Sequence, residues 1–375
     1  NGVTALLKIA TGPKSRLFGS FVGGLGIVTV SFILSFYAIV SGWMLAFLLQ
    51  PVAQVIGLTA LADWLVVDGV VRNSLFVVVF MLLTIFIISA GVKEGIEKWA
   101  TRLMPSLVLI LVLLIVYVFT LPGAMEGLRA YLVPDFSVFA RPGLLVSAMG
   151  QAFFSLSLGV GTMLVYGSYI SKSENLPVIG SLVALLDVGI AVLAGLLILP
   201  AMYVALASGV EIFDAQGGLI AGPGLIISVL PALFDSMGAV GGFVAFAFFA
   251  LMAIASLTSS ISMLEVPVSF VVESKGVRRP AAAFLLGSII ALISLVIVFN
   301  FDSLFDLVVT ATTEMSQPLL GLFFCVFSGW IWNRATILEE IKQGAPDAAS
   351  GFFWRIWPFY IRFVCPAAIL IVYLQ

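Results

Sequence analysis

Nine long runs of apolar residues dominate the sequence and limit what the chain can fold into. They lie at 22–49, 74–90, 104–121, 144–170, 177–205, 238–272, 281–299, 306–332 and 353–374. A membrane-spanning helix needs about 20 such residues, and a helix satisfies its backbone polar groups within one segment. Apolar side chains make up 62% of the 375 residues and charged ones 10%, whereas ordinary domains carry about 25% charged residues. We predict an all-α polytopic membrane protein of about nine transmembrane helices, with residues 1–375 forming a single integral domain.

The lysines and arginines are distributed unequally between the loops. Thirteen of the seventeen lie in the N-terminal segment and in every second loop after it, while the opposite side holds Arg72, Arg129 and Arg141. Positively charged loops stay in the cytoplasm. We therefore expect a multi-pass protein of the cell (inner) membrane whose N-terminal segment is cytoplasmic.

The residue types exclude several kinds of function. The chain contains no histidine, which rules out a Ser–His–Asp triad, a histidine metal site and an imidazole proton relay in these residues. Cys325 and Cys365 lie inside apolar runs and are expected to pack as small core residues. The acids are scattered, which argues against a membrane-embedded enzyme, and the net charge of −2 gives no reason to expect nucleic acid.

The fourth apolar run contains glycines and serines that weaken a helix at membrane depth. Ser155, Ser157, Gly159 and Gly161 alternate with apolar residues, and each glycine costs about 1 kcal/mol in a helix interior. One interpretation is a broken helix lining a cavity, the arrangement that transporters use to bind ions and substrates. The other is close helix packing through small residues.

Asp187 lies in the middle of the fifth run. A carboxylate at that depth is costly and usually faces a cavity or a partner. Every basic residue except Arg362 lies in a loop or near the end of a run, so sodium is a natural companion for this acid. The alternative is a protonated, hydrogen-bonded aspartate of purely structural role.

The sixth run carries hydroxyl groups on more than one helical face. Thr258 and Ser259, together with a backbone carbonyl, could supply the oxygen ligands that a hard cation prefers. Serine and threonine also commonly join helices to one another. Glu265 and Glu314 are further acids within the apolar runs, and each fits either a gate or a structural hydrogen bond.

Together these segments resemble the neurotransmitter:sodium symporter family, in its bacterial amino-acid-transporting branch with the leucine transporter. The matching motifs are Phe36-Tyr37 with Ser41-Gly42-Trp43, 93–98 with Met104-Pro105, 150–161, Asp187 with Ala194-Gly195, Gly222-Pro223-Gly224 with Leu230-Pro231, 257–260 and Gly329-Trp330. The resemblance implies a partial inverted-repeat (five-plus-five) transporter fold with one discontinuous helix. It also implies that the nine runs are the family's third to eleventh helices, the first two lying outside this sequence.

The resemblance implies a substrate site. Tyr37 matches the tyrosine that binds the substrate carboxylate, and Phe154 matches the aromatic lid over the substrate. The other positions that match the substrate pocket are Ile33, Ser155, Ser157, Val160, Ser259 and Met263.

It also implies two sodium sites, each incomplete without the family's first helix. Ser155 and Asp187 match the first site, and the Ala255 carbonyl with Thr258 and Ser259 matches part of the second. Many relatives carry Asn where this chain has Asp187. Because a fixed carboxylate there supplies the negative charge that chloride otherwise provides, we expect chloride independence.

Four residues are expected to take part in gating. Gly95 and Pro105 reproduce the family's Gly-x9-Pro spacing, which is associated with unwinding at the inner sodium exit, although Pro105 alone could simply kink the helix. Asp306 is a candidate for the outer-gate acid, and Phe154 is the lid.

These expectations combine into a non-enzymatic function: sodium-coupled symport of an amino acid, with an apolar or aromatic side chain favoured, by alternating access. The expected partners are the amino acid, sodium ions and the lipid bilayer. An alternative is a truncated, non-transporting membrane fragment or partner-binding module of the same family.

Overall fold

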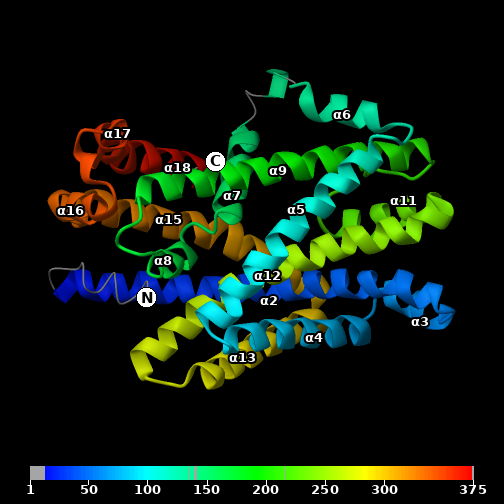
Figure 1. Ribbon diagram of the computed structural model, residues 1–375, viewed down its shortest axis with the longest axis horizontal. Coiled ribbons are helices and arrows are strands. Elements are labelled where there is room, and N and C mark those ends of the chain that lie inside the picture. The colour runs from blue at the N-terminus through cyan, green and yellow to red at the C-terminus, as the bar shows by residue number, and fades with distance from the viewer. Residues whose placement is uncertain (1–12, 135, 139–141, 216, 374–375) are drawn as a thin grey trace.

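The computed structural model describes residues 13–134, 136–138, 142–215 and 217–373, and almost all of its regular structure is helical (Figure 1). The first half of the chain forms α2 (Pro13–Val55), α3 (Thr59–Val66), α4 (Val70–Ser89), α5 (Lys98–Val118), α6 (Ala124–Leu132), α7 (Pro142–Ser155), α8 (Thr162–Gly167) and α9 (Leu176–Ala207). The second half forms α10 (Gly222–Gly224), α11 (Leu230–Ser236), α12 (Gly241–Lys275), α13 (Arg279–Phe299), α14 (Phe301–Val309), α15 (Gln317–Val326), α16 (Arg334–Gly344), α17 (Phe352–Phe359) and α18 (Cys365–Tyr373).

Seven helices of the described chain are long and apolar enough to cross a membrane. They lie within Gly19–Val55, Val70–Ser89, Lys98–Val118, Leu176–Ala207, Gly241–Lys275, Arg279–Phe299 and Phe352–Ile371. An eighth candidate is the pair Phe301–Ile331 and Arg334–Gly344, which is apolar and long enough only when taken together and is bent by 100° between its two parts. Its first part joins α14 to α15 through a π-helical segment, and its second part is α16. The remaining predicted run, 144–170, is divided between the short helices α7 and α8. The polytopic all-α prediction is confirmed.

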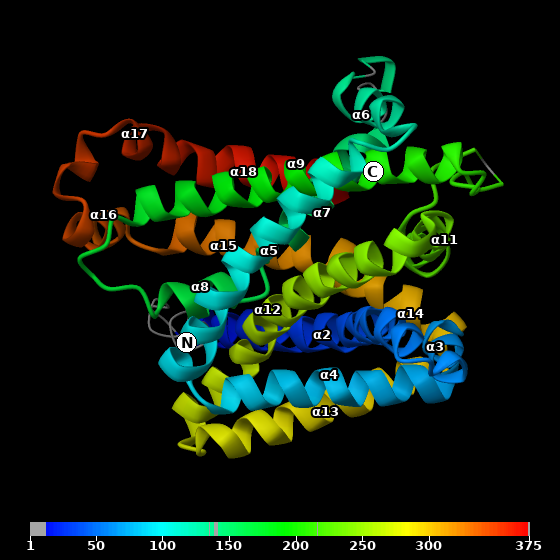
Figure 2. The same cartoon turned by 45° about the vertical axis from the view of Figure 1, so that its right-hand side comes forward.

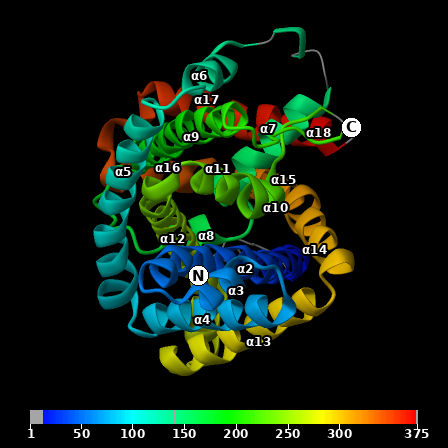
Figure 3. The ribbon, with the colours of Figure 1, turned by 90° about the vertical axis from the view of Figure 1, so that its right-hand side faces the viewer.

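The helices pack in layers around a central crossing. Helices α2 and α12 contact each other along much of their length at the centre. Helices α4 and α13 lie side by side on one face, and α9, α15 and α18 lie on the other (Figures 2 and 3). Helix α5 runs obliquely across the bundle between these faces, contacting both α12 and α9.

Aromatic and aliphatic side chains fill the central crossing. Phe47 of α2 lies 5.2 Å, centroid to centroid, from Phe249 of α12, and both rings are buried. Cys325 and Cys365 are free thiols that contact each other between α15 and α18, in line with packed core cysteines. Apolar burial therefore holds the two central helices together where they cross.

Different short helices lie at the two ends of the bundle. Helices α3, α11 and α14 lie beside the C-terminal end of α2, at the right of Figure 2, while α8 and α16 lie at the opposite end.

Candidate functional site

The fourth predicted run is broken, as one interpretation of the sequence required. Helix α7 ends at Ser155, α8 begins at Thr162, and the residues between them are not helical. Ser157, Gly159 and Gly161 have φ angles of +50°, +87° and +89°. Residues with a side chain adopt such positive φ angles at a cost in free energy, whereas glycine adopts them readily. The glycines that weaken the helix in sequence are thus used for the turn itself.

Gly159 is required by packing as well as by its φ angle. A Cβ atom at this position would lie 2.6 Å from the Gln317 carbonyl oxygen and 3.0 Å from the Gly321 nitrogen, both on α15. The buried amide of Gln317 donates a 2.9 Å hydrogen bond to the Phe153 carbonyl at the end of α7. Helix α15 therefore holds the break in place from behind.

A cavity of about 610 Å³ opens beside the break, between α2, α5, α9 and α12. All eleven residues predicted for the substrate and sodium sites line it: Ile33, Tyr37, Phe154, Ser155, Ser157, Val160, Asp187, Ala255, Thr258, Ser259 and Met263. These residues come from four segments that are far apart in the chain. The structure brings the whole predicted set to one place.

The carboxylate of Asp187 faces the end of α7. The Ser155 hydroxyl donates a 2.6 Å hydrogen bond to Asp187 Oδ1, and Asp187 is half-buried in α9. Both residues line the cavity, so a hydroxyl and an anionic oxygen stand together there. Oxygen ligands of this kind suit a hard monovalent cation.

Two hydroxyl groups of α12, those of Thr258 and Ser260, have different surroundings. Thr258 donates a 2.8 Å hydrogen bond to the Ala255 carbonyl, and both line the cavity, which leaves the oxygen lone pairs of Thr258 available to a cation. Ser260, in contrast, is fully buried and pairs at 2.9 Å with Thr84 of α4. Thr258 therefore faces the cavity, whereas Ser260 joins two helices.

The remaining pocket positions combine one polar group with apolar walls. The Tyr37 hydroxyl is hydrogen-bonded to Ser259 across α2 and α12. Ile33, Val160 and Met263 are buried and apolar. A ligand with one polar end and one apolar end fits such a lining.

Of the predicted gating residues, Phe154 lines this cavity, Gly95 and Pro105 are next in sequence to residues that line it, and Asp306 does not line it. Gly95 lies in a π-helical turn, Val92–Glu97, that continues into α5 with Pro105 inside it, so this segment is wound in the structure. Their neighbours Ile96 and Met104 line the cavity wall. Asp306 lies exposed on α14 at the other end of the bundle.

Sequence reasoning missed several residues of the cavity wall, among them Gln151, Tyr166, Ser262 and Gln317. Gln151 and Tyr166 flank the broken segment, so a helix-by-helix search around the break could have found them. Gln317 lies on α15, and no local pattern links it to the break.

The two acids of open role have different environments. Glu265 is fully buried on α12 and accepts hydrogen bonds from the Arg279 guanidinium and the Tyr169 hydroxyl. Glu314 is exposed and lines a second cavity of about 440 Å³ that shares Gln151 and Phe154 with the first. Glu265 is thus an ion-pair partner, and Glu314 faces a space next to the aromatic lid.

Comparisons with known proteins agree with this architecture. A sodium-dependent transporter of Bacillus subtilis (strain 168), YhdH, is 30% identical over 395 aligned positions, covering 100% of this chain and 82% of the relative. A sodium-dependent transporter of Haemophilus influenzae is 29% identical, covering 96% of this chain and 79% of its own length.

A solved structure shares the fold. The crystal structure of MhsT in complex with L-phenylalanine superposes with a TM-score of 0.84 at 33% identity, covering 100% of this chain and 84% of that one. Residues 57–375 match the sodium:neurotransmitter symporter family. A match over that length, with a relative and a solved structure covering the whole chain, shows that the protein belongs to the sodium:neurotransmitter symporter family of transporters.

Proposed function

We propose that this chain carries out sodium-coupled symport of an amino acid with an apolar or aromatic side chain. The observation that carries the proposal is the single cavity of about 610 Å³ that all eleven predicted site residues line. Membership of a sodium symporter family supports the ion coupling. The complex of the structurally similar MhsT with L-phenylalanine supports an amino-acid substrate.

In this proposal the two ends of the substrate meet different walls. Tyr37, whose oxygen accepts a hydrogen bond from Ser259, donates its own hydroxyl hydrogen to the substrate carboxylate in a charge-assisted hydrogen bond. Ile33, Val160 and Met263 surround the side chain, because their buried apolar surface favours an apolar or aromatic group. Phe154 covers the substrate from the side of the second cavity.

Sodium is proposed to bind at two places along the same wall. Ser155 and Asp187 contribute oxygen atoms to the first site. The Ala255 carbonyl and the hydroxyls of Thr258 and Ser259 contribute to the second. Because Asp187 supplies a fixed negative charge beside the first sodium ion, transport is proposed to be independent of chloride.

Alternating access would open the cavity first to one side of the membrane and then to the other. Asp306 and Phe154 are proposed to act at the outer side, and the π-helical turn with Gly95 and Pro105 at the inner side. We propose that the N-terminal segment lies in the cytoplasm of a cell with an inner membrane, which the excess of lysine and arginine in alternate loops supports. No step in this cycle requires a covalent reaction, so we propose no enzymatic activity.

Uptake of radiolabelled amino acids into proteoliposomes tests the proposal. An inward sodium gradient should drive accumulation of phenylalanine, a potassium gradient of equal size should not, and a sodium ionophore should abolish the uptake. Replacing chloride by gluconate should leave the rate unchanged. Saturable binding of phenylalanine with no sodium-driven uptake would favour a non-transporting member of the family.

A further inference from the structure

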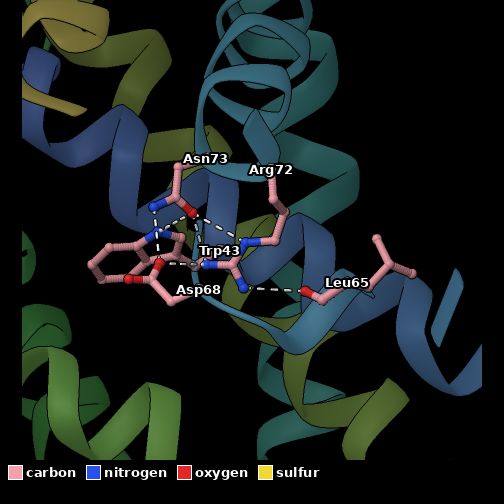
Figure 4. A network of polar contacts seen from close by, with 5 residues as sticks. All are labelled: Trp43, Leu65, Asp68, Arg72 and Asn73. Atoms are coloured by element: carbon pink, nitrogen blue, oxygen red, sulfur yellow. Dashed lines mark hydrogen bonds and ion pairs between the residues drawn. The ribbon is translucent and has the colours of Figure 1, made fainter. Parts of the chain in front are cut away.

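Arg72 is a buried arginine outside the cavity, in the first turn of α4 (Figure 4). Its side chain is 1% exposed and lies over the ring of Phe47, with the guanidinium carbon 5.5 Å from the ring centroid. The guanidinium donates to the Leu65 carbonyl at 3.2 Å and to Asp68 Oδ1 at 3.1 Å. Because the Asp68 side chain is 62% exposed, the ion pair is screened by solvent and contributes little by itself.

Asn73 supplies the acceptor that organises this cluster. Its Oδ1 atom accepts hydrogen bonds from Arg72 Nε at 3.1 Å and Arg72 Nη2 at 2.7 Å. It also accepts a 3.0 Å hydrogen bond from Trp43 Nε1 on α2. Its Nδ2 atom donates to Asp68 Oδ1 at 3.0 Å. One amide oxygen therefore ties an arginine to an indole on another helix.

Trp43 passes this constraint on to α14. Its buried ring lies 6.3 Å from Phe305, stacked at an interplanar angle of 30°, and 5.9 Å from Phe301. Phe301 and Phe305 are themselves stacked at 4.6 Å. Asp306 follows Phe305 directly on this helix.

Packing alone does not explain the polar groups of the cluster. Apolar residues could fill the same volume without the desolvation cost of a buried guanidinium. The planar fork of Arg72 and the single indole N–H instead fix the orientation of the Trp43 ring, which apolar contacts leave free to turn. Aromatic rings prefer particular mutual angles, so the orientation of Trp43 sets where Phe305 sits.

We propose that Arg72 and Asn73 are positioning residues that act through Trp43 to hold α14, and with it Asp306, in place at this end of the bundle. The part that concerns gating rests on the proposed function, since Asp306 is a gate only if the chain transports. The mechanical part, that the Asn73–Trp43 hydrogen bond holds α14, stands independently of transport.

Thiol labelling tests the mechanical part. Leu304 is a half-buried residue of α14, so a Leu304→Cys reporter, in a chain with Cys325→Ala and Cys365→Ala, measures how firmly the helix is seated. Asn73→Leu and Trp43→Phe each remove the hydrogen bond, and Trp43→Phe keeps a ring beside α14. Each should raise the rate of labelling by a maleimide more than roughly twofold, because a loosened helix exposes its half-buried positions more often.

Ser294→Ala on α13 is the matched control, since it too removes one buried side-chain hydrogen bond, here from the Ser294 hydroxyl to the Ile290 carbonyl. Its labelling rate should equal that of the parent. If Asn73→Leu does not fold, Trp43→Phe decides alone. A folded Trp43→Phe protein that labels within twofold of the parent overturns the proposal.

A double-mutant cycle in proteoliposomes tests the link to Asp306. If Asn73 acts through that residue, the two substitutions Asn73→Leu and Asp306→Asn should not act independently on the KM of uptake. The KM change of the double variant should be smaller, by more than roughly threefold, than the product of the two single changes. Effects that multiply would overturn the link to Asp306. Raised labelling without sodium-driven uptake by the parent would contradict the proposed function and leave the mechanical part supported.

Discussion

The Ser155 hydroxyl donates a 2.6 Å hydrogen bond to the Asp187 carboxylate, joining the last residue of α7 to the middle of α9. The bond lies directly before the break in the fourth span and on the wall of the cavity. Any ion bound between these two oxygens would therefore contact both the broken helix and the one intramembrane aspartate of α9. This coupling of an ion position to a helix break underlies the first prediction.

Asp187→Asn should change the ion dependence of uptake. The substitution keeps the size of the side chain but removes its negative charge, so sodium activation should weaken or become dependent on chloride. Initial rates against sodium concentration, with chloride and with gluconate, measure this. Asp347→Asn, which removes an exposed carboxylate far from the cavity, should behave like the parent. Unchanged ion dependence in Asp187→Asn would remove Asp187 from the sodium site.

Tyr37→Phe should weaken the affinity for the amino acid. The change removes one hydroxyl and leaves the ring, and a hydrogen bond to a charged group contributes about 1.5–3 kcal/mol. KM should therefore rise roughly ten- to hundredfold, while maximal uptake changes little because the other walls remain. The concentration dependence of phenylalanine uptake at saturating sodium provides the measurement. A KM equal to that of the parent would place the substrate carboxylate elsewhere.

Thr258→Val combined with Ser259→Ala should abolish sodium coupling. Both changes keep the approximate shape of the side chains and remove two candidate oxygen ligands from the cavity wall. Ser260→Ala is a matched control in the same helix, because Ser260 pairs with Thr84 and lies outside the cavity lining. Uptake should depend on sodium in the control and lose that dependence in the double variant. Coupling that survives in the double variant would make these hydroxyls packing groups only.

The spans could be predicted from the sequence because lipid demands long apolar helices, and a run such as 177–205 has no other stable fold at that length. The break in the fourth run was one of two open interpretations, since glycines serve both close packing and positive φ angles. The structure shows that the helix is broken, and at Gly159 glycine serves both purposes: its φ angle is positive, and it packs closely against α15. Family resemblance was needed to select the eleven cavity residues, whose binding roles stay predictions.

Contacts between distant segments could not be read from local patterns. Glu265 finds its partner in Arg279 because the short turn after α12 folds α13 back against it, and periodicity within one helix carries no such information. The same applies to Asn73 and Trp43, which meet only because α2 and α4 pack together. Two adjacent serines of α12 likewise have different surroundings that the sequence does not reveal: Ser259 lines the cavity, whereas Ser260 pairs with Thr84 of α4.

Gly159→Ala should destabilise the protein more than a glycine substitution in the preceding helix. Alanine at a φ of +87°, with its Cβ 2.6 Å from the Gln317 carbonyl oxygen, should lower the free energy of unfolding by about 1–3 kcal/mol. Gly150→Ala is the control, because Gly150 lies in α7 with nothing within 4 Å of the added atom, and alanine favours the helix. Thermal unfolding of the two purified variants compares them. Equal unfolding midpoints would show that the break tolerates a side chain there.

Glu265→Gln should destabilise the protein because it leaves the Arg279 guanidinium without its counter-charge. Glu265 has no exposed surface, and its carboxylate accepts hydrogen bonds from both Arg279 and Tyr169. Removing one partner of a buried ion pair costs about 3–5 kcal/mol, whereas replacing both by apolar residues is often neutral. The double variant Glu265→Leu with Arg279→Leu should therefore unfold at a higher temperature than Glu265→Gln. Thermal unfolding in detergent measures both, with the exposed Glu339→Gln as a control. If the double variant is instead the less stable of the two, the ion pair contributes net stability to the fold, and this prediction is wrong.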